Sequence, residues 1–198
     1  MTPLHLLVAL PAEARPIRHR FGLVRDNRPH PYPLYRRDEI RLVICGVGRD
    51  NAAGACHWLR GRAPARPTDA WINIGIAGHP EAGVGSPFLA SSVRDGMEGR
   101  ELSTAAPHLD GIGLAPLISL PEARFDYPRE ALLDMEGYAF FSTARRFAPP
   151  RRVACMKIVS DNIRNPATRI NGRMVSELIS DNLPHLDHLI DTLEGTAP

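Results

Sequence analysis

The chain has 198 residues, of which 43% are hydrophobic, and its 24 basic and 22 acidic residues give a formal net charge of +2. This length and composition suit one compact domain, residues 1–198, with a sizeable core. The charges are spread along the chain, with no basic face or tail of the kind that binds nucleic acid. An excess of arginine between residues 15 and 41 is interpreted as a solvated surface.

The cysteines and the apolar segments indicate the compartment. Cys45, Cys56 and Cys155 are an odd number at wide spacing, which indicates core thiols and argues against a disulfide framework or a zinc site. The N-terminus has no cationic start or cleavage pattern, and no apolar stretch approaches the length of a membrane span. We therefore expect a soluble cytoplasmic protein with no membrane association.

The first half of the chain alternates strand-like and helix-like segments. Residues 4–10 form an apolar run typical of a buried strand, and Pro11 then suits the first turn of a helix. Residues 39–45 and 70–78 read as further strands, and residues 50–59 have helical spacing. This alternation is typical of an open α/β sheet.

The second half continues the pattern. Residues 84–93 and 113–119 are strand-like with a polar loop between them, and residues 152–161 resemble a buried strand. An Ala/Phe stretch before residue 147 is helix-like, and residues 169–193 predict two packed helices or one helix kinked at Pro184. The fold class expected is α/β, as a three-layer α/β/α sandwich on a central mixed, twisted sheet.

Several acids lie where such a sheet binds ligands. Glu13 follows the first strand at a strand-to-helix corner, although it could also complement the helix dipole. Glu136, in Asp-Met-Glu, and Asp161, in Ser-Asp, lie beside other elements of the sheet. Taken singly, Glu136 could be a helix-start acid and Asp161 an N-cap.

Glycines at two predicted strand ends suggest close approach to a ligand. The turn Gly46-Val-Gly48 could direct backbone N–H groups at an anion or a sugar hydroxyl. It lacks the third glycine of the dinucleotide fingerprint and the Gly-Lys-Ser/Thr of a P-loop, so neither NAD nor ATP binding is supported. Gly75 and Gly78 could likewise admit a ligand, or serve close packing.

Five segments together resemble the nucleoside phosphorylase and nucleosidase superfamily, most closely the bacterial methylthioadenosine/S-adenosylhomocysteine nucleosidases. The resemblance spans roughly residues 4–165, and its order and spacing make chance matches improbable. The matching segments are Val8-Ala-Leu-Pro-Ala-Glu-Ala14, Gly46-Val-Gly-Arg-Asp-Asn-Ala-Ala53, Ile72-Asn-Ile-Gly-Ile-Ala-Gly78, Asp134-Met-Glu-Gly-Tyr-Ala139 and Lys157-Ile-Val-Ser-Asp161.

The resemblance implies a role for each matching acid. Glu13 corresponds to the base that deprotonates the attacking water, and Met135 and Glu136 to the residues that hold the ribose. Asp161, preceded by Ser160, corresponds to the acid that protonates the purine. Breaking a ribosyl C–N bond builds positive charge on the sugar and negative charge on the base, which suits carboxylates near the sugar and a proton donor beside the base.

Two residues depart from the family pattern. Ile76 replaces a serine that helps to hold the water, and Lys157 replaces an arginine near it. Lys157 is also the exception in a chain whose other basic residues are all arginine, which chance could equally explain. The base-binding loop is assigned to residues 119–124.

These observations predict an N-ribosyl hydrolase and leave two alternatives. A phosphorylase could hold phosphate at Gly46 and Gly48 with Arg49 and Lys157, although Glu13 would repel it. A nucleoside-binding protein with weakened turnover is suggested by Ile76 and by a middle segment that is short for the family.

No metal or organic cofactor is implied. The resemblance implies a homo-oligomer, with a dimer favoured. Tyr138, Phe140 and Phe141 are available either for that contact or for the core.

Overall fold

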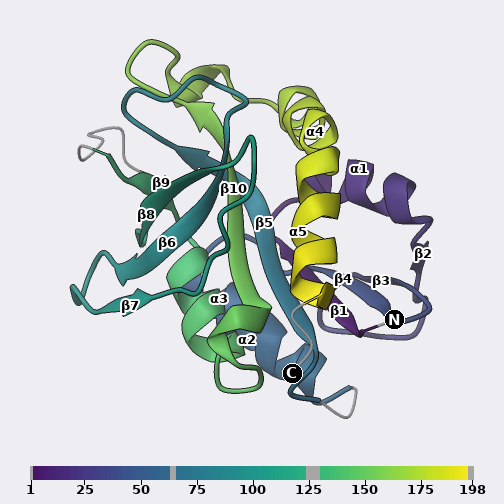
Figure 1. Cartoon of the computed structure of the whole chain (residues 1–198). Coiled ribbons are helices and arrows are strands. Elements are labelled where there is room, and N and C mark those ends of the chain that lie inside the picture. Colours follow the sequence, from purple (N-terminus) through teal and green to yellow (C-terminus); the bar gives the residue numbers. More distant parts are fainter. Residues whose placement is uncertain (1, 63–65, 124–129, 196–198) are drawn as a thin grey trace.

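A computed structural model of the chain describes residues 2–62, 66–123 and 130–195. Its centre is a ten-stranded mixed sheet in the order β10-β6-β8-β9-β5-β1-β4-β3-β2, with β7 beside β6 (Figure 1). The strands are β1 (Leu4–Val8), β2 (Val24–Arg25), β3 (Leu34–Arg37), β4 (Ile40–Ile44), β5 (Ala70–Gly78), β6 (Pro87–Asp95), β7 (Glu101–Ser103), β8 (Gly113–Ser119), β9 (Leu132–Asp134) and β10 (Val153–Asp161).

Helices cover both faces of the sheet. One face packs against α1 (Pro11–Phe21), α4 (Gly172–Asp181) and α5 (Leu183–Gly195), and the other against α2 (Arg49–Arg60) and α3 (Gly137–Ala144) (Figure 1). Two 3-10 turns, Pro150–Arg152 and Ala167–Arg169, complete the helical elements described. The predicted three-layer α/β/α architecture with a mixed sheet is therefore confirmed.

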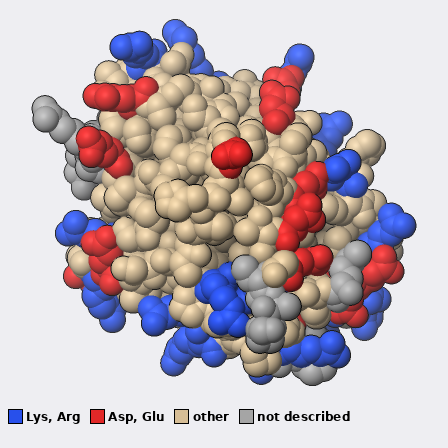
Figure 2. All heavy atoms as spheres, viewed as in Figure 1, with Lys and Arg blue, Asp and Glu red and all other residues tan. Residues whose placement is uncertain are grey.

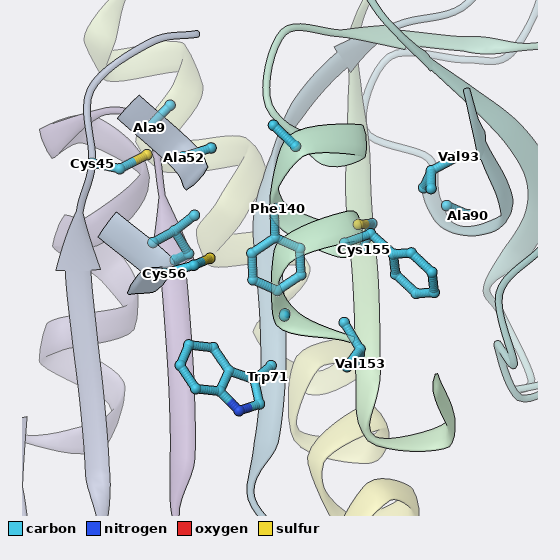
Figure 3. Close-up of a cluster of buried hydrophobic side chains, with 14 of the residues drawn as sticks. Ala9, Cys45, Ala52, Cys56, Trp71, Ala90, Val93, Phe140, Val153 and Cys155 are labelled. Atoms are coloured by element: carbon cyan, nitrogen blue, oxygen red, sulfur yellow. The ribbon is translucent and has the colours of Figure 1, made fainter. Parts of the chain in front are cut away.

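The central strands read as continuous apolar runs because both of their faces are buried. In β5, Trp71 belongs to the hydrophobic cluster beneath α2 and α3, whereas Ile72 and Ile74 belong to the cluster beneath α1, α4 and α5. In β10, Cys155 and Met156 divide in the same way. Successive side chains of a strand point to opposite faces of the sheet, so alternate residues of each central strand belong to alternate hydrophobic clusters. Figure 3 shows the first cluster.

Five of the strands form a closed circuit. β5 pairs in parallel with β10, which pairs antiparallel with β6. β6, β8 and β9 are then parallel neighbours, and β9 returns to β5 where Gly78 lies opposite Leu133. The sheet is thus open on the β1 side and closed like a small barrel on the other.

The first helix is held at its ends and to its neighbour. Gly22 has φ 59° and ends α1 with its N–H directed to the carbonyls of the last turn. Pro16 lies inside the helix, where it cannot bond to the carbonyl of Ala12. The Ser176 hydroxyl of α4 donates to that carbonyl at 2.7 Å, which ties α4 to the helix that carries Glu13.

Several elements differ from expectation. The sequence did not indicate the short strands β2, β3, β7 and β9. Two helices form between residues 172 and 195, with Pro184 in the first turn of α5, where its missing N–H removes no bond. Asp161 is not an N-cap, because it ends β10 and the next helical turn follows Pro166.

The buried aromatics and thiols belong to the core. Phe140 and Phe141 are fully buried within the chain, which contradicts a role for them in a subunit contact, whereas Tyr138 is partly exposed. The dimer itself stays a prediction. Cys45, Cys56 and Cys155 are buried free thiols, as expected.

The distribution of surface charge, the length of the helices and the grouping of possible metal ligands can each be compared with the expected partners. Acidic and basic side chains are interspersed around the face shown in Figure 2, and its broad central area is uncharged except for an isolated acidic side chain. No helix among the described residues combines the length and apolar character that crossing a bilayer requires. Within the same residues, no cluster of His, Cys, Asp and Glu is arranged to hold a metal ion.

Truncation of Phe140 tests the packing of α3. Its ring is fully buried, so Phe140→Ala should lower the free energy of unfolding by about 3–5 kcal/mol through lost contacts and the cavity left behind. Phe21→Ala, at the partly exposed end of α1, is the matched control and should cost less. Urea denaturation of both variants measures the difference, and equal losses would contradict this account of the core.

Candidate functional site

A cavity of about 230 Å³ lies at the carboxyl ends of the parallel strands β1, β5 and β10. Glu13, Glu136 and Asp161, which are far apart in the sequence, all line it. The described residues that line it include no arginine, lysine or histidine. They are Ala9, Leu10, Glu13, Val47, Ile76, Ala77, Gly78, Leu120, Glu122, Ala123, Leu133, Asp134, Met135, Glu136, Ser160, Asp161, Ala167 and Ile170.

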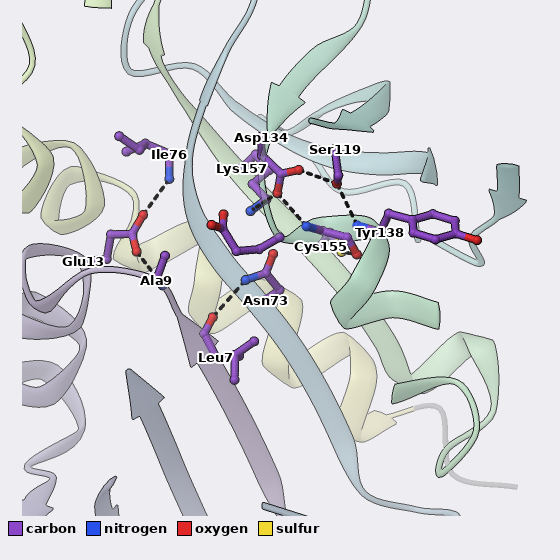
Figure 4. A network of polar contacts seen from close by, with 12 residues as sticks. Leu7, Ala9, Glu13, Asn73, Ile76, Ser119, Asp134, Tyr138, Cys155 and Lys157 are labelled. Carbon is purple, nitrogen blue, oxygen red and sulfur yellow. Dashed lines mark hydrogen bonds and ion pairs between the residues drawn. The ribbon is translucent and has the colours of Figure 1, made fainter. Parts of the chain in front are cut away.

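The Glu13 carboxylate is held by backbone amides from two strand ends. Its Oε2 accepts the N–H groups of Ala9 at 2.9 Å and Leu10 at 2.8 Å, and its Oε1 accepts that of Ile76 at 3.0 Å (Figure 4). The side chain is buried, and desolvation raises the pKa of Glu13 although these amides and Lys157 oppose the rise. A fixed carboxylate with a raised pKa is suited to accept a proton near neutral pH.

Gly75 makes room for this carboxylate. A Cβ at position 75 would lie 2.6 Å from Glu13 Oε1, closer than any real contact allows. The glycine that the sequence suggested for ligand approach therefore accommodates one of the chain's own acids.

Glu136 lies at the start of α3 and is bound from across the sheet. Its Oε1 accepts the Gly48 N–H at 2.6 Å, and its side chain makes no bond to its own helix. Gly48 has φ 105°, a conformation that favours glycine, so the turn can present this amide. Burial and then the Asp134 charge raise the pKa of Glu136 to about 7, against opposition from Lys157 and the Gly48 amide.

Asp161 ends β10, where the strand is irregular. The pairing of β10 with β5 shifts register between Val159 and Asp161, so Ser160 has no partner in the ladder. The Ser160 hydroxyl donates to Asp161 Oδ1 at 2.5 Å, and Asp161 is 6% exposed. The irregularity thus coincides with the point where the strand meets the cavity.

The remaining predicted residues divide between the cavity and its surroundings. Met135 and Ile76 line the cavity and are partly exposed. Within the proposed base-binding loop, Leu120, Glu122 and Ala123 line it, whereas residue 124 lies outside the described residues.

The group proposed for phosphate is largely bound to the chain's own carboxylates. Of its members only Ile76 lines the cavity, whereas Gly46, Gly48, Arg49 and Lys157 do not. Gly48 N–H is directed at Glu136, and Arg49 Nη2 lies 3.1 Å from Asp95 Oδ2.

Asp134 is a site residue that the sequence analysis did not single out. Its Oδ2 lies 2.7 Å from Lys157 Nζ, and both side chains are 1% exposed. Burial lowers the pKa of Lys157, but the Asp134 and Glu136 charges outweigh it and the pKa is raised overall. The signal was the place of Lys157 within the continuous apolar run of β10, which is buried on both faces, because a buried ammonium needs a carboxylate partner.

Replacement of Glu136 by Gln should flatten the pH dependence of stability. The pKa of Glu136 is about 7 in the folded chain, against an ordinary value of 4.5. Between pH 4.5 and pH 7 the folded chain binds more protons at this position than the unfolded chain does. The protonated Glu136 therefore stabilises the fold fully below pH 4.5, and this stabilisation is lost as the pH rises through 7. This contribution should be on the order of 3 kcal/mol in the parent chain and missing in Glu136→Gln, which keeps the smaller dependence that comes from the raised pKa of Glu13.

Urea denaturation from pH 4 to pH 8 measures this difference. Glu177→Gln, an exposed substitution in α4, is the control and should keep the parent's dependence. A parent and a Glu136→Gln variant with the same dependence would contradict the burial described for this carboxyl.

No family model and no curated protein sequence matches the chain. Among solved structures, the 5'-methylthioadenosine nucleosidase of Arabidopsis thaliana superposes with a TM-score of 0.79 at 18% identity, over 100% of this chain and 98% of the other.

Two structures from Helicobacter pylori are similar as well. Its 5'-methylthioadenosine/S-adenosylhomocysteine nucleosidase gives a TM-score of 0.76 at 12% identity, over 96% of this chain and 98% of the other. Its futalosine hydrolase gives 0.75 at 11% identity, over 96% and 97%. The whole described chain therefore has the α/β fold of these nucleosidase structures.

Proposed function

We propose that the protein is a nucleosidase, an N-ribosyl hydrolase that cleaves the glycosidic bond of a purine nucleoside or a 5'-thio-substituted adenosine. The observation that carries the proposal is the convergence of Glu13, Glu136 and Asp161 on one cavity. The nucleosidase fold supports it, since proteins of that fold include methylthioadenosine nucleosidases and a futalosine hydrolase.

Glu13 is proposed as the general base that activates water. Three amide donors fix its orientation, and burial gives it the raised pKa that a base needs near neutral pH. Ile76 offers a backbone N–H to Glu13 but no side-chain hydroxyl to the water, so the water depends on the carboxylate itself.

Glu136 and Met135 are proposed to hold the ribose. The carboxylate of Glu136 has a free set of lone pairs beyond the Gly48 contact and can accept bonds from a vicinal diol. Met135 adds an apolar, polarizable wall. Among the described residues the lining is acidic and holds no cation, which also favours the positive charge that develops on the sugar as the C–N bond breaks.

Asp161 is proposed as the general acid that protonates the leaving base. Its burial and the short bond from Ser160 hold its carboxyl in one place at the edge of the cavity. A proton delivered there would neutralise the negative charge of the departing purine.

Hydrolysis is favoured over phosphorolysis by the pairing of the cationic groups. Gly48 N–H and Lys157 contact Glu136 and Asp134 respectively, and Arg49 contacts Asp95. Phosphate would have to displace these carboxylates and then lie beside Glu13, which would repel it.

Asp161→Asn should lower the rate of base release from adenosine or methylthioadenosine by about 10²–10⁴-fold, because the leaving base loses its proton donor. Binding, measured by calorimetry, should change little. Asp110→Asn, an exposed change outside the cavity lining, is the control and should keep the parent rate.

Each assay is run with and without added phosphate. Full activity of Asp161→Asn would remove the acid assignment, and strict dependence on phosphate would indicate a phosphorylase. Nucleoside binding without base release by the parent chain would indicate a binding protein.

Gly75→Ala tests the placement of Glu13 without changing an acid. The added methyl would lie 2.6 Å from Glu13 Oε1, so the carboxylate must leave its three amides. Base release should fall by on the order of 10²-fold. Gly83→Ala is the matched control, since its nearest contact would be an ordinary 3.5 Å to Ser86. Equal rates for the two variants would contradict Glu13 as the base.

A further inference from the structure

We propose that Asp134 and Lys157 are positioning residues for Glu136: the pair anchors the segment that carries Glu136, and its two charges act on that carboxylate in opposite senses. The inference rests on the proposed function, in which Glu136 holds the ribose. It assigns to the buried pair a task beyond filling the core.

The first support is the set of bonds that ties the residues after Glu136 to Asp134. Asp134 Oδ2 accepts the Gly137 N–H at 2.8 Å, and its Oδ1 accepts the Ser119 hydroxyl at 2.5 Å (Figure 4). The same hydroxyl oxygen accepts the Tyr138 N–H at 2.8 Å. The two residues that follow Glu136 are therefore tied to the carboxylate of Asp134, which precedes it: Gly137 directly and Tyr138 through Ser119. The turn from β9 into α3 cannot move without breaking these bonds.

The second support is the place of Lys157. It lies in the middle of β10 and brings an ammonium group to Asp134 at 2.7 Å, with 1% of its side chain exposed. An arginine would need more donors satisfied and more room in this core, whereas an ammonium is a compact point charge. A lysine here, in a chain whose other basic residues are arginines, fits that requirement.

The third support is the set of groups that face Glu136. Asp134 and Glu13 disfavour its ionised form, whereas Lys157 and the Gly48 N–H favour it. These groups come from separate elements: Asp134 from β9, Lys157 from β10, Glu13 from α1 and Gly48 from the turn before α2. The Cys45 thiol, directly after β4, also interacts with Glu136. Removing one charge of the pair should therefore move the titration of Glu136 in a direction set by its sign.

The test compares Asp134→Asn and Lys157→Met with the parent chain. The titration of Glu136 is followed by NMR of carboxyl-labelled glutamate, with the signal assigned by its loss in Glu136→Gln. We expect the pKa of Glu136 to fall in Asp134→Asn and to rise in Lys157→Met, each by about one pH unit or more. Unchanged values, or shifts in the same direction, would overturn the proposal.

A variant that conserves the charge of Lys157 separates the effect of its charge from the effect of its size. Lys157→Arg keeps the charge but in a larger side chain that fits less well, so the pKa of Glu136 should lie between its values in the parent and in Lys157→Met. A pKa at or above that in Lys157→Met would overturn the electrostatic role. Asp187→Asn, in an exposed ion pair between α1 and α5, is the control and should leave the titration unchanged. If Lys157→Met does not fold, the direction of the shift in Asp134→Asn decides alone.

The same variants give a second readout in the activity assay. The acidic limb of the pH profile of base release should shift in the same directions as the NMR titration. If the parent chain releases no base, the proposed function fails while the NMR titration still decides whether the pair acts on Glu136.

Discussion

The structure depends on the burial of a carboxylate that only strand ends can satisfy. Glu13 is removed from water in the first turn of α1, and its oxygens are bound by amides that follow β1 and end β5. Parallel pairing of β1 with β5 brings those amides together. The position of α1, the absence of a side chain at Gly75 and the floor of the cavity all follow from this arrangement.

The site is a balance of charges assembled from separate elements. Acids from α1, β9, β10 and the start of α3 line the cavity, and a single buried ammonium lies behind them. Each acid is held by a different donor: amides bind Glu13, a glycine turn binds Glu136, and a hydroxyl binds Asp161. Burial strengthens the electrostatic interactions among these groups and raises the pKa values of Glu13 and Glu136.

Much of the fold was predictable from the sequence because its main strands are long and buried on both faces. Residues 70–78 and 113–119 were predicted with the bounds that β5 and β8 have. β9 was not predictable, because a strand of three residues is too short to show a pattern of alternating polar and apolar side chains. The contacts of Gly48 with Glu136 and of Lys157 with Asp134 join residues that are distant in sequence. Local sequence patterns could therefore indicate that a buried charged residue needs a partner, but not which residue that partner is.

The closed circuit of β5, β10, β6, β8 and β9 determines how the cavity can respond to a ligand. Gly78 pairs on one side with Leu133 and on the other with Asp161, so a single residue joins the strands on both sides of the wall. No strand of such a ring can swing outward alone, because its neighbours would lose their ladder bonds. Any widening of the wall is therefore a collective motion of all five strands, so the width of the cavity is set by the ring as a whole.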